Sequence, residues 1–203
     1  MADQQHPKAA DVTISRGDGI AVLAILVLGA GLGGWIAGMG LIRGVFRLFD
    51  PSRYPVELLA TVPVKAGKDA IEAHADTIQV TFSQLQEAPL WLLSLSDISG
   101  AVAIGLATAS FAFALARIVS GKPFHRSMQS AALIAGSSIM FGGLLAQGLG
   151  GLGQMMVALD LGAPAEPAFT FEPLPIIVGA AVLALVYVFR AGRRLQRDTE
   201  GLV

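Results

Sequence analysis

The chain has 203 residues, of which 54% are hydrophobic and 14% are charged, and its formal net charge is −1. Soluble domains carry about 25% charged residues, so this composition excludes a disordered chain and is typical of a membrane protein. The near-zero net charge argues against direct binding of nucleic acid. The absence of cysteine excludes disulfides and thiolate metal sites.

The first predicted membrane helix covers residues 20–42. Residues 1–17 are polar, and the apolar run that follows is too long for a cleaved signal peptide, so we expect it to remain as an anchor. About 20 apolar residues suffice to cross roughly 30 Å of hydrocarbon. Arg43 and Arg47 mark the far end, and Asp50-Pro51 is expected to stop the helix.

The loop of residues 50–89 is the largest predicted soluble segment. Residues 56–64 and 77–85 are predicted to be strands, because they are rich in β-branched residues or alternate polar with apolar ones. Residues 66–69 indicate a turn, and residues 70–75 indicate a short helix or a loop. We therefore expect a small strand-containing cap on one face of the membrane.

Three further apolar runs complete the prediction. The expected spans are residues 96–118, 128–149 and 174–189. Residues 90–95 could extend the second span or lie in the interface, and the glycines at 150–153 could break or kink the third. Residues 154–161 could continue the third helix or lie on the surface. The predicted fold is thus an all-α membrane protein, a four-helix bundle in which residues 1–203 form one domain.

The distribution of basic residues predicts the orientation, because positive charges near span ends mark the cytoplasmic side. The loop after the second span and the C-terminal segment are basic, with Arg117, Lys122, Arg126, Arg190, Arg193, Arg194 and Arg197. The loop after the third span has no basic residue. Both termini are therefore expected in the cytoplasm, where this basic surface could bind lipid headgroups or a cytoplasmic partner. Arg43 and Arg47 would then lie on the outer side, against the rule.

Small residues recur at four-residue spacing in three spans, so each series falls on one helix face. The series are Gly29/Gly33/Ala37 and Gly34/Gly38, then Ala101/Gly105/Ala109 and Ser99/Ala103/Ala107, then Gly142/Ala146/Gly150 and Gly143/Gln147/Gly151. Such residues let helix backbones approach closely in lipid. Two interpretations are open. The faces could pack within one bundle, or one of them, most readily in the first span, could meet another subunit or protein.

Three polar residues in or near the spans are candidates for a functional role. Counting about 20 residues back from Arg117 places Asp97 at the outer interface. Asp97 could cap the start of the second helix together with Ser94 and Ser96, make a helix–helix contact, or handle ions. Gln147 and Gln154 are seven residues apart, so with Asp97 they could line a polar pocket near the outer surface, or each could make one interhelical hydrogen bond.

Catalytic chemistry is not indicated. The three histidines, at positions 6, 74 and 125, are far apart in the sequence and have no partner at metal-ligand spacing. No serine stands near a base, and the run Gly29–Gly34 lacks the strand–loop–helix context of a nucleotide site. We expect no enzyme, no cofactor and no metal.

Two segments resemble a known family. The segment Ala116–Phe124, ARIVSGKPF, resembles a G-x-P-F loop between two spans, and the ending Val188–Val203 resembles an F-x-x-G-x-x-L-Q tail. Both are similar to domain-of-unknown-function family 2975, small bacterial membrane proteins with four spans and a larger loop after the first. The resemblance implies the bacterial inner membrane and no assigned catalytic residue. Members often accompany a small helix-turn-helix regulator, which implies a cytoplasmic regulatory partner.

Two functions are consistent with these observations. In the first, the protein is a non-enzymatic accessory, scaffold or regulatory protein that acts through helix–helix contacts, as a homo-oligomer or with another membrane protein. In the second, it is a subunit of an oligomeric channel or transporter whose path runs near Asp97, Gln147 and Gln154. A lipid-modifying enzyme would need paired acids, histidines or a metal, which the sequence does not offer.

Overall fold

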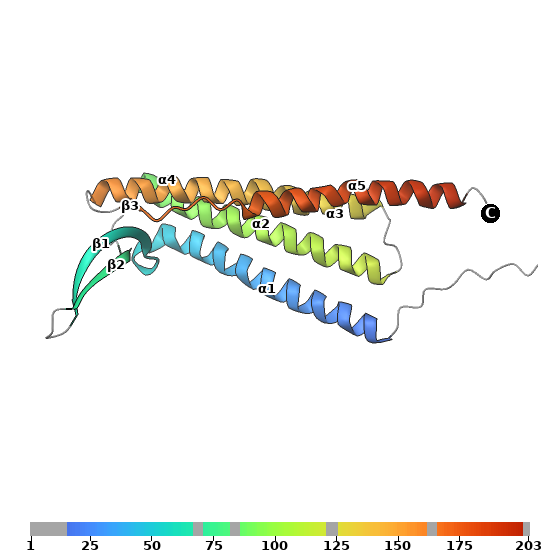
Figure 1. Cartoon of the computed structure of the whole chain (residues 1–203), viewed down its shortest axis with the longest axis horizontal. Helices are drawn as coiled ribbons and strands as arrows, with labels where there is room; N and C mark the ends of the chain where they lie inside the picture. Colours follow the sequence, from blue (N-terminus) through green and yellow to red (C-terminus); the bar gives the residue numbers. More distant parts are fainter. Residues whose placement is uncertain (1–15, 67–70, 82–85, 121–125, 162–165, 201–203) are drawn as a thin grey trace, which may run out of the picture.

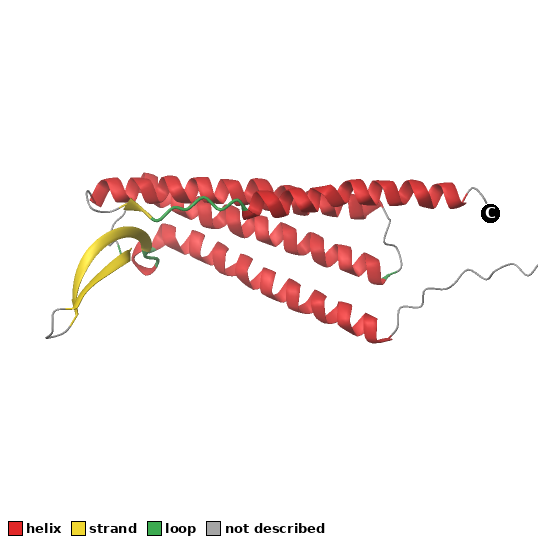
Figure 2. Ribbon diagram, viewed as in Figure 1, coloured by secondary structure: helices red, strands yellow, loops and turns green. Residues whose placement is uncertain are grey.

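The computed structural model describes residues 16–66, 71–81, 86–120, 126–161 and 166–200. Long helices run side by side, and a small sheet lies at one end of them (Figure 1). Figure 2 shows the same molecule coloured by secondary structure. We call the end that carries the sheet the hairpin end. The opposite end, where α1 begins and α5 finishes, is the terminal end.

The described residues include four helices, or helical runs, that are long and apolar enough to cross a membrane. They are α1 (Arg16–Phe49), α2 (Glu87–Val119), the continuous run α3 (Arg126–Ser137), η2 (Ser138–Gly142) and α4 (Gly143–Leu161), and α5 (Leu174–Glu200). The chain is thus a multi-pass membrane protein, as its composition predicted. Each helix is longer than its predicted span, because helical structure continues past the apolar segment that the hydropathy pattern detects.

The second and third spans differ from the prediction in detail. Helix α2 begins at Glu87, so residues 90–95 belong to the helix. Pro89 occupies its first turn, where a missing N–H removes no helical hydrogen bond. The third helix is not broken at the glycines 150–153, and it continues to Leu161. Its irregularity lies earlier, in the π-helical turn η2.

The sheet has three antiparallel strands in the order β2-β1-β3. Strand β1 (Val56–Ala66) matches the first predicted strand. Strand β2 (Ile71–Val80) starts earlier than predicted, so the helix or loop expected at 70–75 is wrong. Its ladder against β1, from Val56↔Val80 to Ala66↔Ile71, determines that start. Of the turn predicted at residues 66–69, Ala66 belongs to β1 and the rest lies outside the described residues, as does the expected end of the second strand at residues 82–85.

Strand β3 (Glu166–Pro167) comes from the loop between α4 and α5 and pairs with β1 at Leu58 and Leu59. The sequence pattern did not predict it, because two residues are too short to show any periodicity. The pairing attaches the loop before α5 to the sheet, and the loop then runs along α4 towards the start of α5 (Figure 1).

The most completely buried apolar cluster of the described residues lies at the hairpin end. Leu58 and Val157 are fully buried there, next to Val56, Leu93 and Ala158. Along the rest of the helices most large apolar side chains are exposed, as lipid-facing residues must be. The sheet is therefore packed onto the ends of α2 and α4.

Candidate functional site

Helix α1 packs against α2 through small residues. A Cβ atom placed on Gly33 would collide with the side chain of Thr108, and one on Gly40 would lie 3.0 Å from the Cβ of Ala101. On Gly44 it would lie 2.9 Å from the carbonyl oxygen of Ser94. These contacts allow the two backbones to approach closely. Gly40 and Gly44 continue the predicted Gly29/Gly33/Ala37 face, and the sequence reasoning did not include them.

A second glycine face on α1 is open. Cβ atoms placed on Gly31, Gly34 and Gly38 would meet nothing within 4 Å among the described residues. Gly29 would meet only one atom of Phe111, at an ordinary 3.8 Å. The two series predicted for the first span therefore have different environments, one packed on α2 and one without a neighbour among the described residues.

The third helix uses its two small-residue series in different directions. Gly142 and Gly150 face α2, where a Cβ atom placed on Gly142 would contact Ala103 and one placed on Gly150 would contact Ser96. From α2, Gly105 faces α1 instead, where a Cβ placed on it would lie 3.7 Å from the Cβ of Ala37. Helix α2 is thus the central helix, with α1 on one side and α4 on the other.

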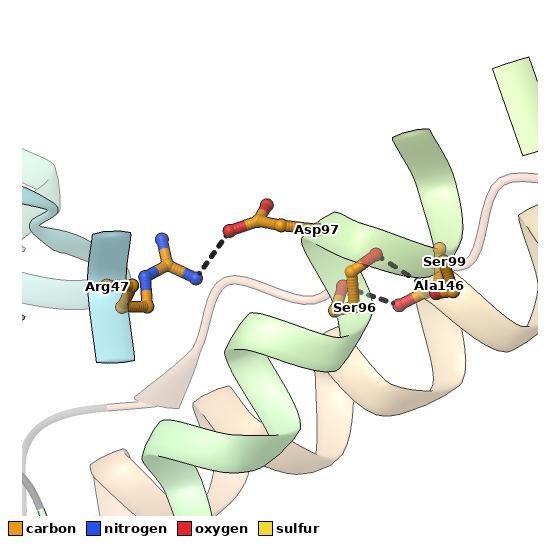
Figure 3. A network of polar contacts seen from close by, with 5 residues as sticks. All are labelled: Arg47, Ser96, Asp97, Ser99 and Ala146. Carbon is orange, nitrogen blue, oxygen red and sulfur yellow. Dashed lines mark hydrogen bonds and ion pairs between the residues drawn. The ribbon is translucent and has the colours of Figure 1, made fainter. Parts of the chain in front are cut away.

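A serine hydroxyl joins α2 to α4 at this contact. Ser96 Oγ donates a hydrogen bond of 2.8 Å to the carbonyl oxygen of Ala146, and Ser99 Oγ donates one of 3.0 Å to the carbonyl of Ser96 (Figure 3). Both serines are partly buried, so the hydroxyls are satisfied within the bundle.

The other series on α4 holds the segment before α5. A Cβ on Gly143 would lie 2.7 Å from Pro175, and one on Gly151 would lie 2.8 Å from the ring of Phe169. Gln147 forms a double hydrogen bond with the backbone of Glu172, donating at 3.1 Å and accepting at 2.9 Å. Helix α5 therefore begins level with Gly143, the first residue of α4, near the middle of the continuous run from α3 to α4.

The closest approach of α3 and α5 was not predicted. A Cβ on Gly136 would lie 2.9 Å from the carbonyl oxygen of Gly179, and a Cβ on Gly179 would lie 2.9 Å from the carbonyl oxygen of Gly136. Gly136 extends an alanine series, Ala131/Ala132/Ala135, and this run of small residues could have indicated a close helix contact. Its partner Gly179 stands alone in an apolar run and carries no such signal.

Asp97 does not cap a helix. It lies well inside α2, which begins at Glu87, so the capping prediction is wrong. Its Oδ2 lies 2.8 Å from Nη1 of Arg47, and the two side chains are 19% and 9% exposed (Figure 3). The distance is that of an ion pair, and neither this oxygen nor Arg47 Nε has a hydrogen-bond partner among the described residues. Asp97 is therefore a helix–helix contact between α1 and α2.

Beyond α1, a second charge pair forms at the end of the helix. The Ser52 hydroxyl donates a hydrogen bond to Asp50, and Arg53 lies 2.9 Å from the same carboxylate. The hydrogen bond from Ser52, followed by the charge of Arg53, lowers the pKa of the Asp50 carboxyl below its usual value. Arg53 remains largely exposed.

The predicted polar residues gather around one open cavity of about 700 Å³ near the hairpin end. It lies between α1, α2, α4 and the loop before α5. Asp97, Gln147 and Gln154 line it together with two charged residues that were not predicted there, Arg43 and Glu172. The Oε1 atom of Gln154 is buried and accepts no hydrogen bond from the described residues.

The predicted basic residues that the structure describes lie at the terminal end. Arg117 lies over the ring of Phe113, at 5.2 Å, and Arg190 over Tyr187, at 5.9 Å. Arg193, Arg194 and Arg197 follow in the last turns of α5. Lys122 lies outside the described residues.

No metal site is found among the described residues, where no three acidic or histidine side chains are grouped to hold an ion. The chain matches no protein-family model, no curated protein and no solved structure. The resemblance to family 2975 therefore stays a prediction.

Proposed function

We propose that this chain is a non-catalytic membrane protein that binds a transmembrane helix of a second chain through α1, as an accessory, scaffold or regulatory subunit. The observation that supports it is the open face of Gly31, Gly34 and Gly38. Among the described helices, α1 packs extensively only against α2, so this face has no partner in its own bundle.

The energetics favour a partner over lipid. A glycine inside a helix is destabilising by about 0.5–1 kcal/mol relative to alanine, and lipid contact alone does not require one. Three glycines at spacings of three and four fall on one face, which gives a flat strip on which another helix can pack closely. The face of α1 formed by Gly33, Gly40 and Gly44 shows the same kind of packing, with α2 as the partner helix.

We expect Gly34→Leu combined with Gly38→Leu to abolish the complex and leave the monomer folded. Each leucine would extend into open space in the monomer but would obstruct a helix packed on this face. The protein is extracted in native lipid discs, and its mass and companions are determined by native mass spectrometry. Differently tagged copies in one cell distinguish a second copy of this chain from a foreign protein.

The matched control is Ile25→Ala with Leu32→Ala, which changes two residues exposed by 55% and 64% that do not lie three or four residues from Gly31, Gly34 or Gly38. This control should keep the complex. A complex that survives the leucine substitutions, or a wild-type protein that is strictly monomeric in native discs, would contradict the proposal.

The proposed location is the bacterial inner membrane, with both termini in the cytoplasm. Basic residues support this orientation, because α2 ends near Arg117, α3 begins at Arg126 and α5 carries Arg190 at the terminal end. At the hairpin end, two of the opposing arginines are paired, Arg47 with Asp97 and Arg53 with Asp50. Pairing with an acid offers a reason why these positions do not reverse the orientation.

Single cysteines test the orientation, because the chain has none of its own. Ser52→Cys at the hairpin end and Ser120→Cys at the terminal end both replace exposed residues. In intact bacterial spheroplasts, a membrane-impermeant maleimide should label Ser52→Cys, and it should label Ser120→Cys only after the membrane is permeabilised. The reverse pattern would place the termini outside.

The alternative function is a channel or transporter subunit, and the polar cavity is the observation in its favour. Two features favour the accessory role instead. The side chain of Gln147 is engaged by the backbone of Glu172, and Asp97 is paired with Arg47. If liposomes containing the wild-type protein show ion flux that is abolished by the double variant Arg47→Met with Asp97→Asn, which leaves no unpaired buried charge, the channel becomes the better proposal.

A regulatory role would use the terminal end. Arg117, Arg190 and Arg194 present positive charge there, and the resemblance to family 2975 implies a cytoplasmic regulator as the partner. Such a protein would need an acidic surface to match these residues.

A further inference from the structure

The four spans differ in length, and the difference locates the bilayer. Helix α5 is apolar from Leu174 to Phe189 and becomes basic at Arg190, whereas the other three spans have 30, 33 and 35 residues. At 1.5 Å per residue, the apolar part of α5 is about 24 Å long and the other spans are about 45–53 Å long. The hydrocarbon core is about 30 Å thick, so the apolar part of α5 fits within it and the other helices extend beyond it.

The start of α5 therefore gives the level of the hydrocarbon boundary on the hairpin side. Pro175 lies against Gly143 of α4, next to Gly142, which faces Ala103 of α2. In turn, Gly105 of α2 faces Ala37 of α1. The boundary thus passes near Ala37, Ala103 and Gly143.

The cavity of about 700 Å³ lies across this boundary. Trp35 and Ile104, which line it, fall on the hydrocarbon side. Arg43 and Asp97 are each six residues beyond the boundary, or roughly 9 Å, which is the outer limit of a headgroup layer about 5–8 Å thick on each side. The cavity is therefore apolar at acyl-chain depth and polar at headgroup depth, like a phospholipid.

The charges around the cavity specify the headgroup. Arg43 is exposed to the cavity and has no ion-pair partner among the described residues, so it is available to a phosphate. Glu172 is an exposed carboxylate in the same lining. The Oε1 atom of Gln154, also from the lining, is a hydrogen-bond acceptor to which no described residue donates. The Oε1 atom itself is buried in this conformation, so it can meet a ligand only after the amide rotates about its terminal torsion, which is soft.

The site as a whole is neutral. Arg43 and Arg47 offset Asp97 and Glu172, so a ligand with a net charge gains no overall attraction. A ligand that carries one phosphate, to pair with Arg43, and one hydrogen-bond-donating cation, to pair with Glu172 and Gln154, complements both kinds of group. The volume is also within the usual range for small-ligand sites, about 300–1,000 Å³.

We propose that this cavity binds one zwitterionic phospholipid, with its phosphate on Arg43 and a primary ammonium group beside Glu172 and Gln154. The acyl chains descend past Trp35 and Ile104 into the bilayer. This site is separate from the open glycine face of α1 and does not depend on the association proposed for it.

Native mass spectrometry of the full-length, delipidated protein tests the proposal. Phosphatidylethanolamine, phosphatidylcholine and phosphatidylglycerol with identical acyl chains are added separately. We expect one phosphatidylethanolamine per chain, bound about tenfold more tightly than the other two, which is the value of one charge-assisted hydrogen bond. Phosphatidylcholine lacks the N–H donors, and phosphatidylglycerol brings an uncompensated charge.

Variants assign the binding to the cavity. Arg43→Gln should weaken phosphatidylethanolamine binding about tenfold, Arg43→Lys should restore part of it, and Gln154→Leu should reduce the preference over phosphatidylcholine. Arg53→Gln, at the same end but outside the cavity lining, should bind like the wild type. Equal uptake of the three lipids, tighter binding of phosphatidylglycerol, or unchanged binding in a folded Arg43→Gln variant would overturn the proposal.

Discussion

Gly136→Ala is expected to destabilise the protein by about 1–3 kcal/mol, the usual effect of overpacking a tight contact. The added methyl group would lie 2.9 Å from the carbonyl oxygen of Gly179 and 2.9 Å from the backbone nitrogen of Leu183. Backbone atoms cannot rotate away as side chains do, so α3 and α5 would have to separate. Gly179→Ala should act equally, because its Cβ would meet the backbone of Gly136 and Met140 at the same distance.

The unfolding midpoint in detergent, measured by circular dichroism, would show this effect. The matched controls are Gly34→Ala and Gly38→Ala, which make the same change at positions that are open in the monomer. They should leave the monomer unchanged or stabilise it by up to about 1 kcal/mol, since alanine favours a helix over glycine. A Gly136→Ala variant as stable as these controls would mean that α3 and α5 do not pack as closely as described.

The spans were predictable from the sequence because the interaction that defines them is local. Lipid solvates each apolar run separately, so the length of the run is enough to identify it. The small-residue series were visible for the same reason, since residues four apart share a face. The neighbour of each face was not predictable. Gly34 and Gly33 are adjacent in the sequence, yet only Gly33 contacts α2.

The position of Asp97 shows where local reasoning failed. Ser94, Ser96 and Asp97 resemble a helix cap in sequence, but the apolar residues 90–95 continue the helix towards Glu87. What determines the role of Asp97 is Arg47, fifty residues earlier on another helix. Strand β3 was missed similarly, because it forms through its pairing with Leu58 and Leu59, more than a hundred residues earlier in the chain.

Asp97→Asn is expected to destabilise the protein by about 3–5 kcal/mol, the typical effect of removing one partner of a buried ion pair. The Arg47 side chain is only 9% exposed, so its charge would stay buried without a counter-charge. Arg47→Met should be similarly harmful, because it leaves the carboxylate of Asp97 unpaired. The unfolding midpoint in detergent at neutral pH measures both effects.

The double variant distinguishes the pair from the packing around it. Arg47→Met with Asp97→Asn removes both charges and keeps most of the side-chain volume, so it should be much more stable than the sum of the single variants predicts. The exposed pair of Arg53 and Asp50 provides the comparison, since Arg53→Met with Asp50→Asn should change the midpoint little. If the double variant is instead as unstable as the summed singles, the two charges are not coupled. In that case the pairing between Arg47 and Asp97 cannot explain why a buried arginine is tolerated at the hairpin end of α1.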